Sequence, residues 1–337
     1  MKKLIVILVF IFVLSSFLSS CGQNDSIDSK SDQEQLSEEE RTEVIQIAVI
    51  PRLAFAEENE EQILLGIQES CEQYGIKCDV FRCYGDVSKQ YDYLTKCIKE
   101  KYDGIIYSSL SGGNSFEAGL IQAAKDEGIV VVDFNFLVLQ EDGTINTDAS
   151  IKYDAYSSGR EALRTLVREC GENATILFPM IELDQLHAAS PIAGFLDEAK
   201  NFPSLRLLTS EPMGQIHVEA QKKWVNDWVE SNPEIEGIFC PYDALTVGAY
   251  EVCKEKNSID IKLVGYNAGP EQIEFMRNDL ERSNLIKSFI LLPEKLGNTC
   301  IDVLMEILNG RYSREGSEDI VWVANETITL ANVAEVS

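Results

Sequence analysis

Several residue types are scarce in this chain of 337 residues, and each shortage excludes a class of function. There are two histidines, His187 and His217, and no Cys-x-x-Cys pair, so a typical His/Cys zinc site is not expected. Lysine and arginine number 29 against 56 acidic residues, for a formal net charge of −27. Nucleic-acid binding requires clustered positive charge, so we expect no nucleic-acid partner.

Catalytic signatures are also missing from the sequence. It contains no Walker phosphate loop, no nucleophile beside a base, and no paired carboxylates at a useful spacing. We therefore predict that the protein is not an enzyme and needs neither cofactor nor metal.

Cysteine is not among the scarce residue types, with nine copies. Cys21 has a separate role, argued next. The other eight fall mostly in apolar helix or strand patterns, where a free cysteine behaves as a small hydrophobic residue. They are Cys71, Cys78, Cys83, Cys97, Cys170, Cys240, Cys253 and Cys300. Export would permit disulfides, but a chain of this length can build an ordinary core, so we expect mostly free thiols.

The first twenty residues, 1–20, have the pattern of a targeting segment. Lys2 and Lys3 precede a mostly apolar run to Leu18, which is shorter than the roughly 20 residues of a permanent membrane span. The run ends in Leu18-Ser19-Ser20-Cys21, which resembles the lipobox of bacterial lipoproteins. That resemblance implies lipid attachment at Cys21 after cleavage. The alternative is an ordinary secretory signal with a chance cysteine.

Residues 21–44 are predicted to be an acidic, disordered tether. They include the run Glu38-Glu39-Glu40 and several serines, with almost no large apolar side chain. Such a segment cannot bury enough surface to offset the entropy lost on ordering. The net negative charge also disfavours contact with anionic membrane, so the lipid would be the anchor.

The stretch Tyr102–Asn135 predicts the architecture of the remainder. An apolar strand at Gly104–Tyr107 leads through a polar turn to a helix capped by Asn114 or Ser115. The helix shows an apolar stripe of Phe116, Leu120 and Ala124, and a β-branched strand follows at Ile129–Val132. This βαβ order predicts a parallel sheet with right-handed crossovers, whose ligands lie beyond the carboxyl ends of the strands.

Strand and helix patterns alternate along the rest of the chain and predict an α/β fold of two doubly wound parallel-sheet domains joined by a multi-strand hinge. One domain is expected from residues 45–150 plus about 291–312, and the other from 151–290 plus about 318–337. In the first half, further strands are expected at Ile45–Ile50, Lys77–Cys83 and Thr144–Thr147, and helices at Gln62–Tyr74 and Lys89–Glu100. In the second, strands are expected at Thr175–Phe178, Arg206–Thr209, Gly237–Cys240, Lys262–Tyr266, Leu285–Ile290, Asp319–Val323 and Thr327–Leu330. Helices are expected there at Ser157–Arg168, Pro191–Lys200, Val218–Glu230, Ala244–Glu255, Glu271–Asp279 and Pro293–Gly310.

The order of these elements resembles the ribose- and galactose-type periplasmic binding proteins, the type I solute-binding proteins of ABC transporters. The resemblance runs from Ile45 to the end, and no single motif carries it. The matching pieces are Asp103-Gly104-Ile105-Ile106, Ala123-Ala124-Lys125-Asp126-Glu127-Gly128-Ile129, Tyr156-Ser157-Ser158-Gly159-Arg160, Asn232-Pro233-Glu234-Ile235-Glu236-Gly237-Ile238-Phe239, Asp243-Ala244-Leu245-Thr246-Val247-Gly248-Ala249, Val264-Gly265-Tyr266-Asn267 and Thr329-Leu330-Ala331-Asn332-Val333.

The resemblance implies a set of ligand-contacting residues. They are Arg52, Phe55, Asn59, Ser108, Asn135, Phe136, His187, Tyr242 and Asn267. The family's charged Asp-Arg pair after the fourth strand is replaced here by Asn135-Phe136, and its arginine before a helical Gly-Phe falls on Ala189. Alternatives stay open: Phe55 packing under the cleft, His187 as a plain loop residue, Asp243 as a helix cap, and Gly112-Gly113 as either an anion cradle or a tight turn.

These departures imply a less charged, more aromatic cleft than a pentose or hexose site. We therefore expect a monomeric, lipid-anchored, extracytoplasmic protein that binds a modified or less hydroxylated sugar-like molecule and delivers it to an ABC importer. The alternative is a sensory protein that presents its bound state to a membrane receptor or histidine kinase.

Overall fold

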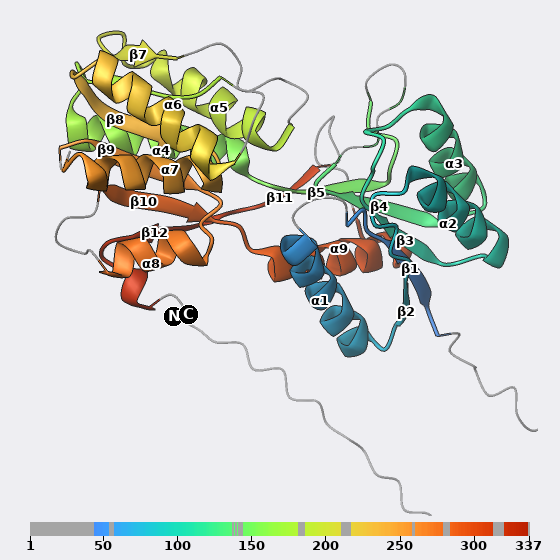
Figure 1. The fold of residues 1–337 in the computed structure, drawn as a ribbon. Coiled ribbons are helices and arrows are strands. Elements are labelled where there is room, and N and C mark those ends of the chain that lie inside the picture. Colours follow the sequence, from blue (N-terminus) through green and yellow to red (C-terminus); the bar gives the residue numbers. More distant parts are fainter. Residues whose placement is uncertain are drawn as a thin grey trace, which may run out of the picture. The chain divides into compact units, whose positions relative to one another are not determined.

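The computed structural model describes residues 44–53, 57–136, 138, 140, 144–180, 186–209, 217–257, 260–278, 284–312 and 320–335. Residues 44–337 form one compact unit that contains two six-stranded sheets. Helices cover both faces of each sheet (Figure 1). Among the described residues, no helix combines the length and apolar character needed to cross a membrane.

The first sheet has the strand order β11-β5-β4-β3-β1-β2 and is parallel throughout. We call it, with its helices, the N-terminal lobe. Its strands are β1 (Gln46–Ile50), β2 (Lys77–Val80), β3 (Gly104–Tyr107), β4 (Val130–Phe134), β5 (Ala149–Tyr153) and β11 (Ile320–Val323). Helices α1 (Glu57–Tyr74) and α9 (Pro293–Leu308) pack on one face, and α2 (Val87–Glu100) and α3 (Ser115–Asp126) on the other.

The second sheet repeats this plan, with the order β12-β10-β9-β8-β6-β7 and one antiparallel edge strand, β12. It forms the C-terminal lobe. Its strands are β6 (Thr175–Leu177), β7 (Arg206–Leu208), β8 (Ile235–Cys240), β9 (Lys262–Tyr266), β10 (Leu285–Ile290) and β12 (Glu326–Thr329). Helices α4 (Ala155–Cys170) and α5 (Leu186–Ala199) pack on one face. Helices α6 (Val218–Ser231), α7 (Asp243–Glu255) and α8 (Pro270–Asn278) pack on the other, with a short 3₁₀ turn η1 (Val333–Glu335).

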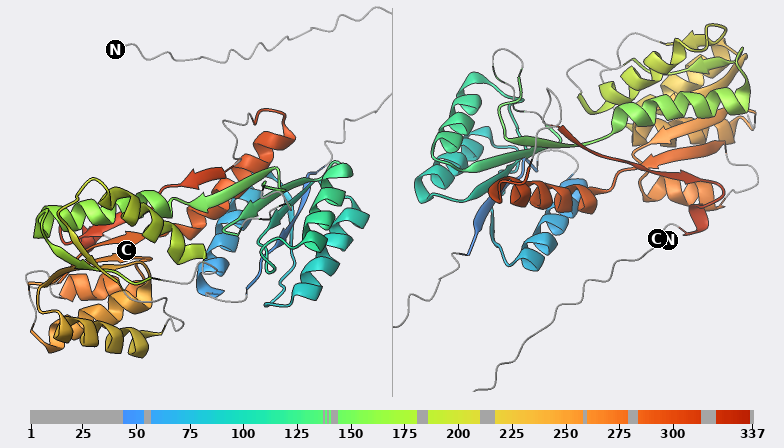
Figure 2. Two further views of the ribbon diagram at one scale, coloured as in Figure 1. Left: turned by 90° about the horizontal axis from the view of Figure 1, so that it is seen from above. Right: turned by 180° about the vertical axis from the view of Figure 1, so that it is seen from behind.

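The chain passes between the sheets three times: after β5, after β10, and between β11 and β12 (Figure 2). These crossings place two strands differently from the sequence expectation. β5 reaches Tyr153 within the first sheet, and β11 also belongs to that sheet rather than to the second half. β11 pairs in parallel with β5, and a short strand at a sheet edge carries no local signal of which sheet it will join.

Three local expectations were wrong. The strand expected at Thr144–Thr147 lies instead at β5, and α5 begins at Leu186, so Pro191 lies inside the helix. The buried face of α3 carries Glu117, Ile121 and Ala124, whereas Phe116 is 62% exposed. Periodicity failed on α3 because a buried carboxylate with enough hydrogen-bond donors can replace an apolar residue.

All eight cysteines from Cys71 to Cys300 are free thiols, six of them buried. Burial raises the pKa of Cys83, Cys97 and Cys253 to about 12 and that of Cys170 to about 11. These thiols are therefore poor nucleophiles at neutral pH.

Candidate functional site

The carboxyl ends of three neighbouring strands in the N-terminal lobe bring together four of the nine expected contact residues. Arg52 follows β1, Ser108 follows β3, and Asn135 and Phe136 follow β4. The Arg52 guanidinium stacks on the Phe136 ring, with Cζ 3.7 Å from the ring centroid. Glu60 lies 3.7 Å from Arg52 Nε. Phe136 and Glu60 therefore hold the one cationic side chain among the expected contact residues in a fixed position.

Two polar atoms at this edge are buried and have no hydrogen-bond partner among the described residues: Arg52 Nε and Ser108 Oγ. The arginine side chain is 12% exposed, and Ser108 is fully buried. Burial lowers the pKa of Arg52, and Glu60 opposes this effect. An unpaired buried polar atom costs about 1–3 kcal/mol, so such atoms at a strand edge indicate a place where a ligand supplies the missing bonds.

The turn after β3 is held by one buried carboxylate, that of Glu117. It accepts hydrogen bonds from the hydroxyls of Tyr107, Ser109 and Ser111 and from the backbone N–H of Gly113. The N–H of Gly112 donates to Ser109 Oγ. These two glycine amides, which could have formed an anion cradle, thus have partners within the turn, so the tight-turn interpretation holds. Their φ angles of +72° and +90° explain why glycine is required.

The carboxyl edge of the second sheet has a different chemistry, built on amides around one carboxyl group. Asn267, after β9, donates from Nδ2 to Asp243 Oδ2 at 2.6 Å, and Gln272 Nε2 donates to Oδ1. Ser288 Oγ on β10 donates to Gln272 Oε1 at 2.9 Å. Tyr242 directs its hydroxyl to Gln221 at 2.8 Å. The Asn267 amide is therefore held by the protein. Asp243 is the first residue of α7 and accepts from side chains rather than capping the helix, whose N-cap residue is Tyr242.

Two buried carboxyl groups near these edges titrate near neutrality. Burial raises the pKa of Asp243 to about 7, although Asn267, the Gly269 amide and Gln272 act against it. Burial likewise raises the pKa of Asp133, on β4, to about 7; Ser150, the Val138 amide and Lys152 oppose the shift. Asn135 and Asn267 occupy corresponding places after β4 and β9, with φ of +61° and +63°. Asparagine tolerates this left-handed conformation better than most residues.

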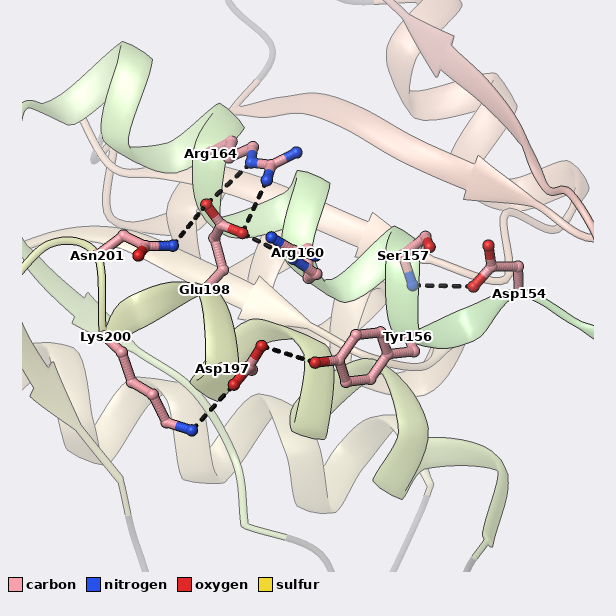
Figure 3. Close-up of polar contacts among 9 residues, drawn as sticks. All are labelled: Asp154, Tyr156, Ser157, Arg160, Arg164, Asp197, Glu198, Lys200 and Asn201. Atoms are coloured by element: carbon pink, nitrogen blue, oxygen red, sulfur yellow. Dashed lines mark hydrogen bonds and ion pairs between the residues drawn. The ribbon is translucent and has the colours of Figure 1, made fainter. Parts of the chain in front are cut away.

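The helix that carries His187 is fixed by close packing against α4. Gly194 and Gly159 allow this approach, since a Cβ would lie 2.0 Å from the Tyr156 carbonyl oxygen and 1.8 Å from that of Pro191, respectively. Glu198 on α5 accepts hydrogen bonds from Arg160 and Arg164 of α4 (Figure 3). The motif around Gly159 thus serves helix packing. His187 falls in the first turn of α5, and its side chain lies outside the described residues.

A polar cluster that the sequence did not single out lies at the crossings. Asn325, between β11 and β12, donates from Nδ2 to the Asp154 carbonyl, Ser158 Oγ and the Tyr266 hydroxyl at 2.9–3.3 Å. Tyr153 ends β5, and its hydroxyl is near Asn59 and Tyr266. No sequence motif could have indicated this cluster, because its members come from four separate elements and from the connection between β11 and β12.

Two expected site residues lie outside the described part of the chain, namely Phe55 and the lipidation residue Cys21. Of the others, Arg52, Ser108, Asn135 and Phe136 lie together at one strand edge, and Tyr242 and Asn267 at the other. Asn59, in the first turns of α1, belongs to the cluster at the crossings.

Comparison with known families identifies this architecture. Residues 48–311 match the family described as "Periplasmic binding protein domain". The chain belongs to that family. Membership confirms the α/β fold class and the resemblance inferred from the sequence, and it groups this binding protein with extracytoplasmic binding proteins rather than enzymes.

Individual relatives are distant in sequence and similar in fold. A D-apiose import binding protein of Actinobacillus succinogenes is 20% identical over 229 residues, which span 68% of this chain and 70% of that protein. A solute-binding protein from the same organism, solved with D-allose, aligns with a TM-score of 0.70 at 17% identity, over 87% of this chain and 100% of the other. A periplasmic ribose ABC transporter protein of Conexibacter woesei has a TM-score of 0.74 at 13% identity, with 87% and 93% coverage.

Proposed function

We propose that this binding protein captures a sugar or sugar derivative between its two lobes and delivers it to an ABC importer while anchored outside the cell by lipid at Cys21. The observation that carries the proposal is the placement of unpaired buried polar atoms at the carboxyl edge of the first sheet. Ligands of doubly wound sheets bind at this edge. The apiose and allose relatives support a sugar as ligand.

The two edges would contribute different interactions. On the N-terminal lobe, Arg52 presents a desolvated guanidinium already fixed on Phe136, which lowers the entropy cost of forming bonds to ligand oxygens. On the C-terminal lobe, Asn267 and Tyr242 flank the Asp243 network. Three crossings allow hinge closure, which would bring both sets onto one ligand.

A thermal-shift screen over sugars, nucleosides and small polar metabolites tests the ligand class. A ligand at about 100 times its dissociation constant stabilises the folded state by roughly 2.7 kcal/mol, which raises the unfolding midpoint. We expect a sugar or sugar derivative to raise the midpoint in this way. Arg52→Lys is the matched variant, because it keeps the charge but loses the planar stack. Stabilisation by nucleosides or amino acids alone, with none by sugars, would contradict the proposal.

A sensory role is the second candidate, because the XylFII–LytSN complex also matches this fold, with a TM-score of 0.66 at 16% identity. Uptake of the radiolabelled ligand by cells lacking the gene separates the two roles. Lost uptake supports delivery to an importer. Unchanged uptake combined with lost ligand-dependent gene expression supports presentation to a membrane sensor.

A further inference from the structure

The cluster at the crossings contains one unpaired donor and one unpaired acceptor. The hydroxyl of Tyr153 and the Oδ1 atom of Asn325 are both buried, and neither has a hydrogen-bond partner among the described residues. Asn59 approaches the tyrosine hydroxyl without satisfying it. The free-energy cost of removing each atom from water is therefore not offset by a hydrogen bond.

The two residues are brought together by strand pairing. Tyr153 is the last residue of β5 and pairs with Val323, the last residue of β11, two positions before Asn325. The Asp154 N–H donates to the Val323 carbonyl at 3.0 Å, which fixes the start of the crossing. Tyr266, at the carboxyl end of β9, links the pair, because it interacts with Tyr153 and accepts from Asn325 Nδ2 at 3.2 Å.

Neighbouring polar atoms of the cluster do have hydrogen-bond partners, so the lack of partners is confined to particular atoms. Asn325 Nδ2 has three acceptors, and Ser158 Oγ also donates to the Asp154 carbonyl at 3.0 Å. The Asn325 side chain is thus held with its amide nitrogen toward α4 and the second sheet. Its carbonyl oxygen is left to accept from another molecule.

A ligand hydroxyl that reached both atoms would satisfy them. Its oxygen accepts from the Tyr153 hydroxyl, and its hydrogen is donated to Asn325 Oδ1. A methyl group would leave both protein atoms unpaired, and a carboxylate or phosphate could not donate to Oδ1 and would place negative charge beside it. The pair therefore selects a neutral hydroxyl.

We propose that Tyr153 and Asn325 form the floor of the ligand site and recognise one ligand hydroxyl, so that they determine specificity for a hydroxyl at one position of the ligand. This inference rests on the proposed function and adds two residues from the hinge to the contacts at the strand edges.

Calorimetric titration with D-apiose, D-allose, D-ribose and L-arabinose, followed by single-deoxy forms of the tightest binder, tests the inference. Tyr153→Phe deletes only the unpaired hydroxyl. We expect it to weaken binding of the tightest sugar about tenfold without lowering the unfolding midpoint of the ligand-free protein. For one deoxy sugar, wild type and variant should bind equally.

Tyr102→Phe is the matched control, because the hydroxyl of this buried tyrosine donates to Asp79 at 2.8 Å near the amino edge of the sheet. It should lower the midpoint and leave affinity unchanged. Equal affinity of wild type and Tyr153→Phe for the tightest sugar would overturn the hinge assignment and leave the proposed function intact. If no sugar in the panel binds the wild type, the proposed function fails, and this inference fails with it.

Discussion

Replacing Glu117 with glutamine is expected to destabilise the N-terminal lobe, because this fully buried carboxylate satisfies four donors. In Glu117→Gln one oxygen becomes an NH₂ group. The remaining oxygen must face the Gly113 N–H, 2.8 Å from Oε2, since an N–H cannot accept. The NH₂ group then replaces Oε1 and faces Tyr107, whose hydroxyl loses its acceptor, whereas the Ser109 hydroxyl can still donate to Oε2.

Hydrogen bonds to charged groups contribute about 1.5–3 kcal/mol each, and the hydroxyls can recover part of this by rotating. We therefore expect a loss of about 2–4 kcal/mol in the free energy of unfolding. For a domain of this size, each kcal/mol corresponds to roughly 2 °C, so the midpoint should fall by about 4–8 °C.

Calorimetry or urea unfolding measures this loss, with Glu127→Gln, at the C-cap of the same helix, as the control. Glu127 is half exposed, and its ion pair with Lys101 is long, at 3.9 Å, so its replacement should cost less than about 0.5 kcal/mol. Equal midpoints for the two variants would refute the argument, because they would show that the turn does not depend on this acceptor.

Two further predictions concern titration and anchoring. Because burial raises the pKa of Asp243 from 3.8 to about 7, folding takes up a proton in this range, and the free energy of unfolding should fall as pH rises from about 4 to 7. Urea unfolding across that range should give a flatter profile for Asp243→Asn; an unchanged slope would assign the dependence elsewhere, for example to Asp133, whose pKa burial also raises to about 7. Cys21→Ala should move the protein from the membrane to the soluble fraction with its unfolding midpoint intact, and an unchanged membrane pool would rule out lipid attachment at that residue.

Local sequence patterns were sufficient for the parallel sheets and for most helix positions. Asn114 caps α3 by accepting from the Glu117 N–H at 2.9 Å. It is one of the two capping residues that the sequence offered, Asn114 and Ser115, because capping depends on residues three positions apart. The runs at β3 and β4 are buried strands as expected. These features arise from interactions within a few residues, and such interactions can be inferred from the chain alone.

The sequence also indicated which strand ends carry polar side chains, since Arg52, Ser108, Asn135 and Asn267 each follow an apolar run. It could not indicate that Arg52 stacks on Phe136, 84 positions away. That contact depends on β1 and β4 both flanking β3, which is a property of the sheet order.

Only the tertiary structure determined which atoms remain unpaired. Tyr153 and Asn325 are 172 positions apart. They meet because β5 pairs with β11, so that Tyr153 lies beside Val323, two positions before Asn325. Whether a buried hydroxyl or amide finds a partner depends on every neighbour within about 3.5 Å, and those neighbours come from separate elements. The sequence by itself therefore determined the fold class and the strand edges, whereas the three-dimensional packing decided where hydrogen bonds are left for a ligand to complete.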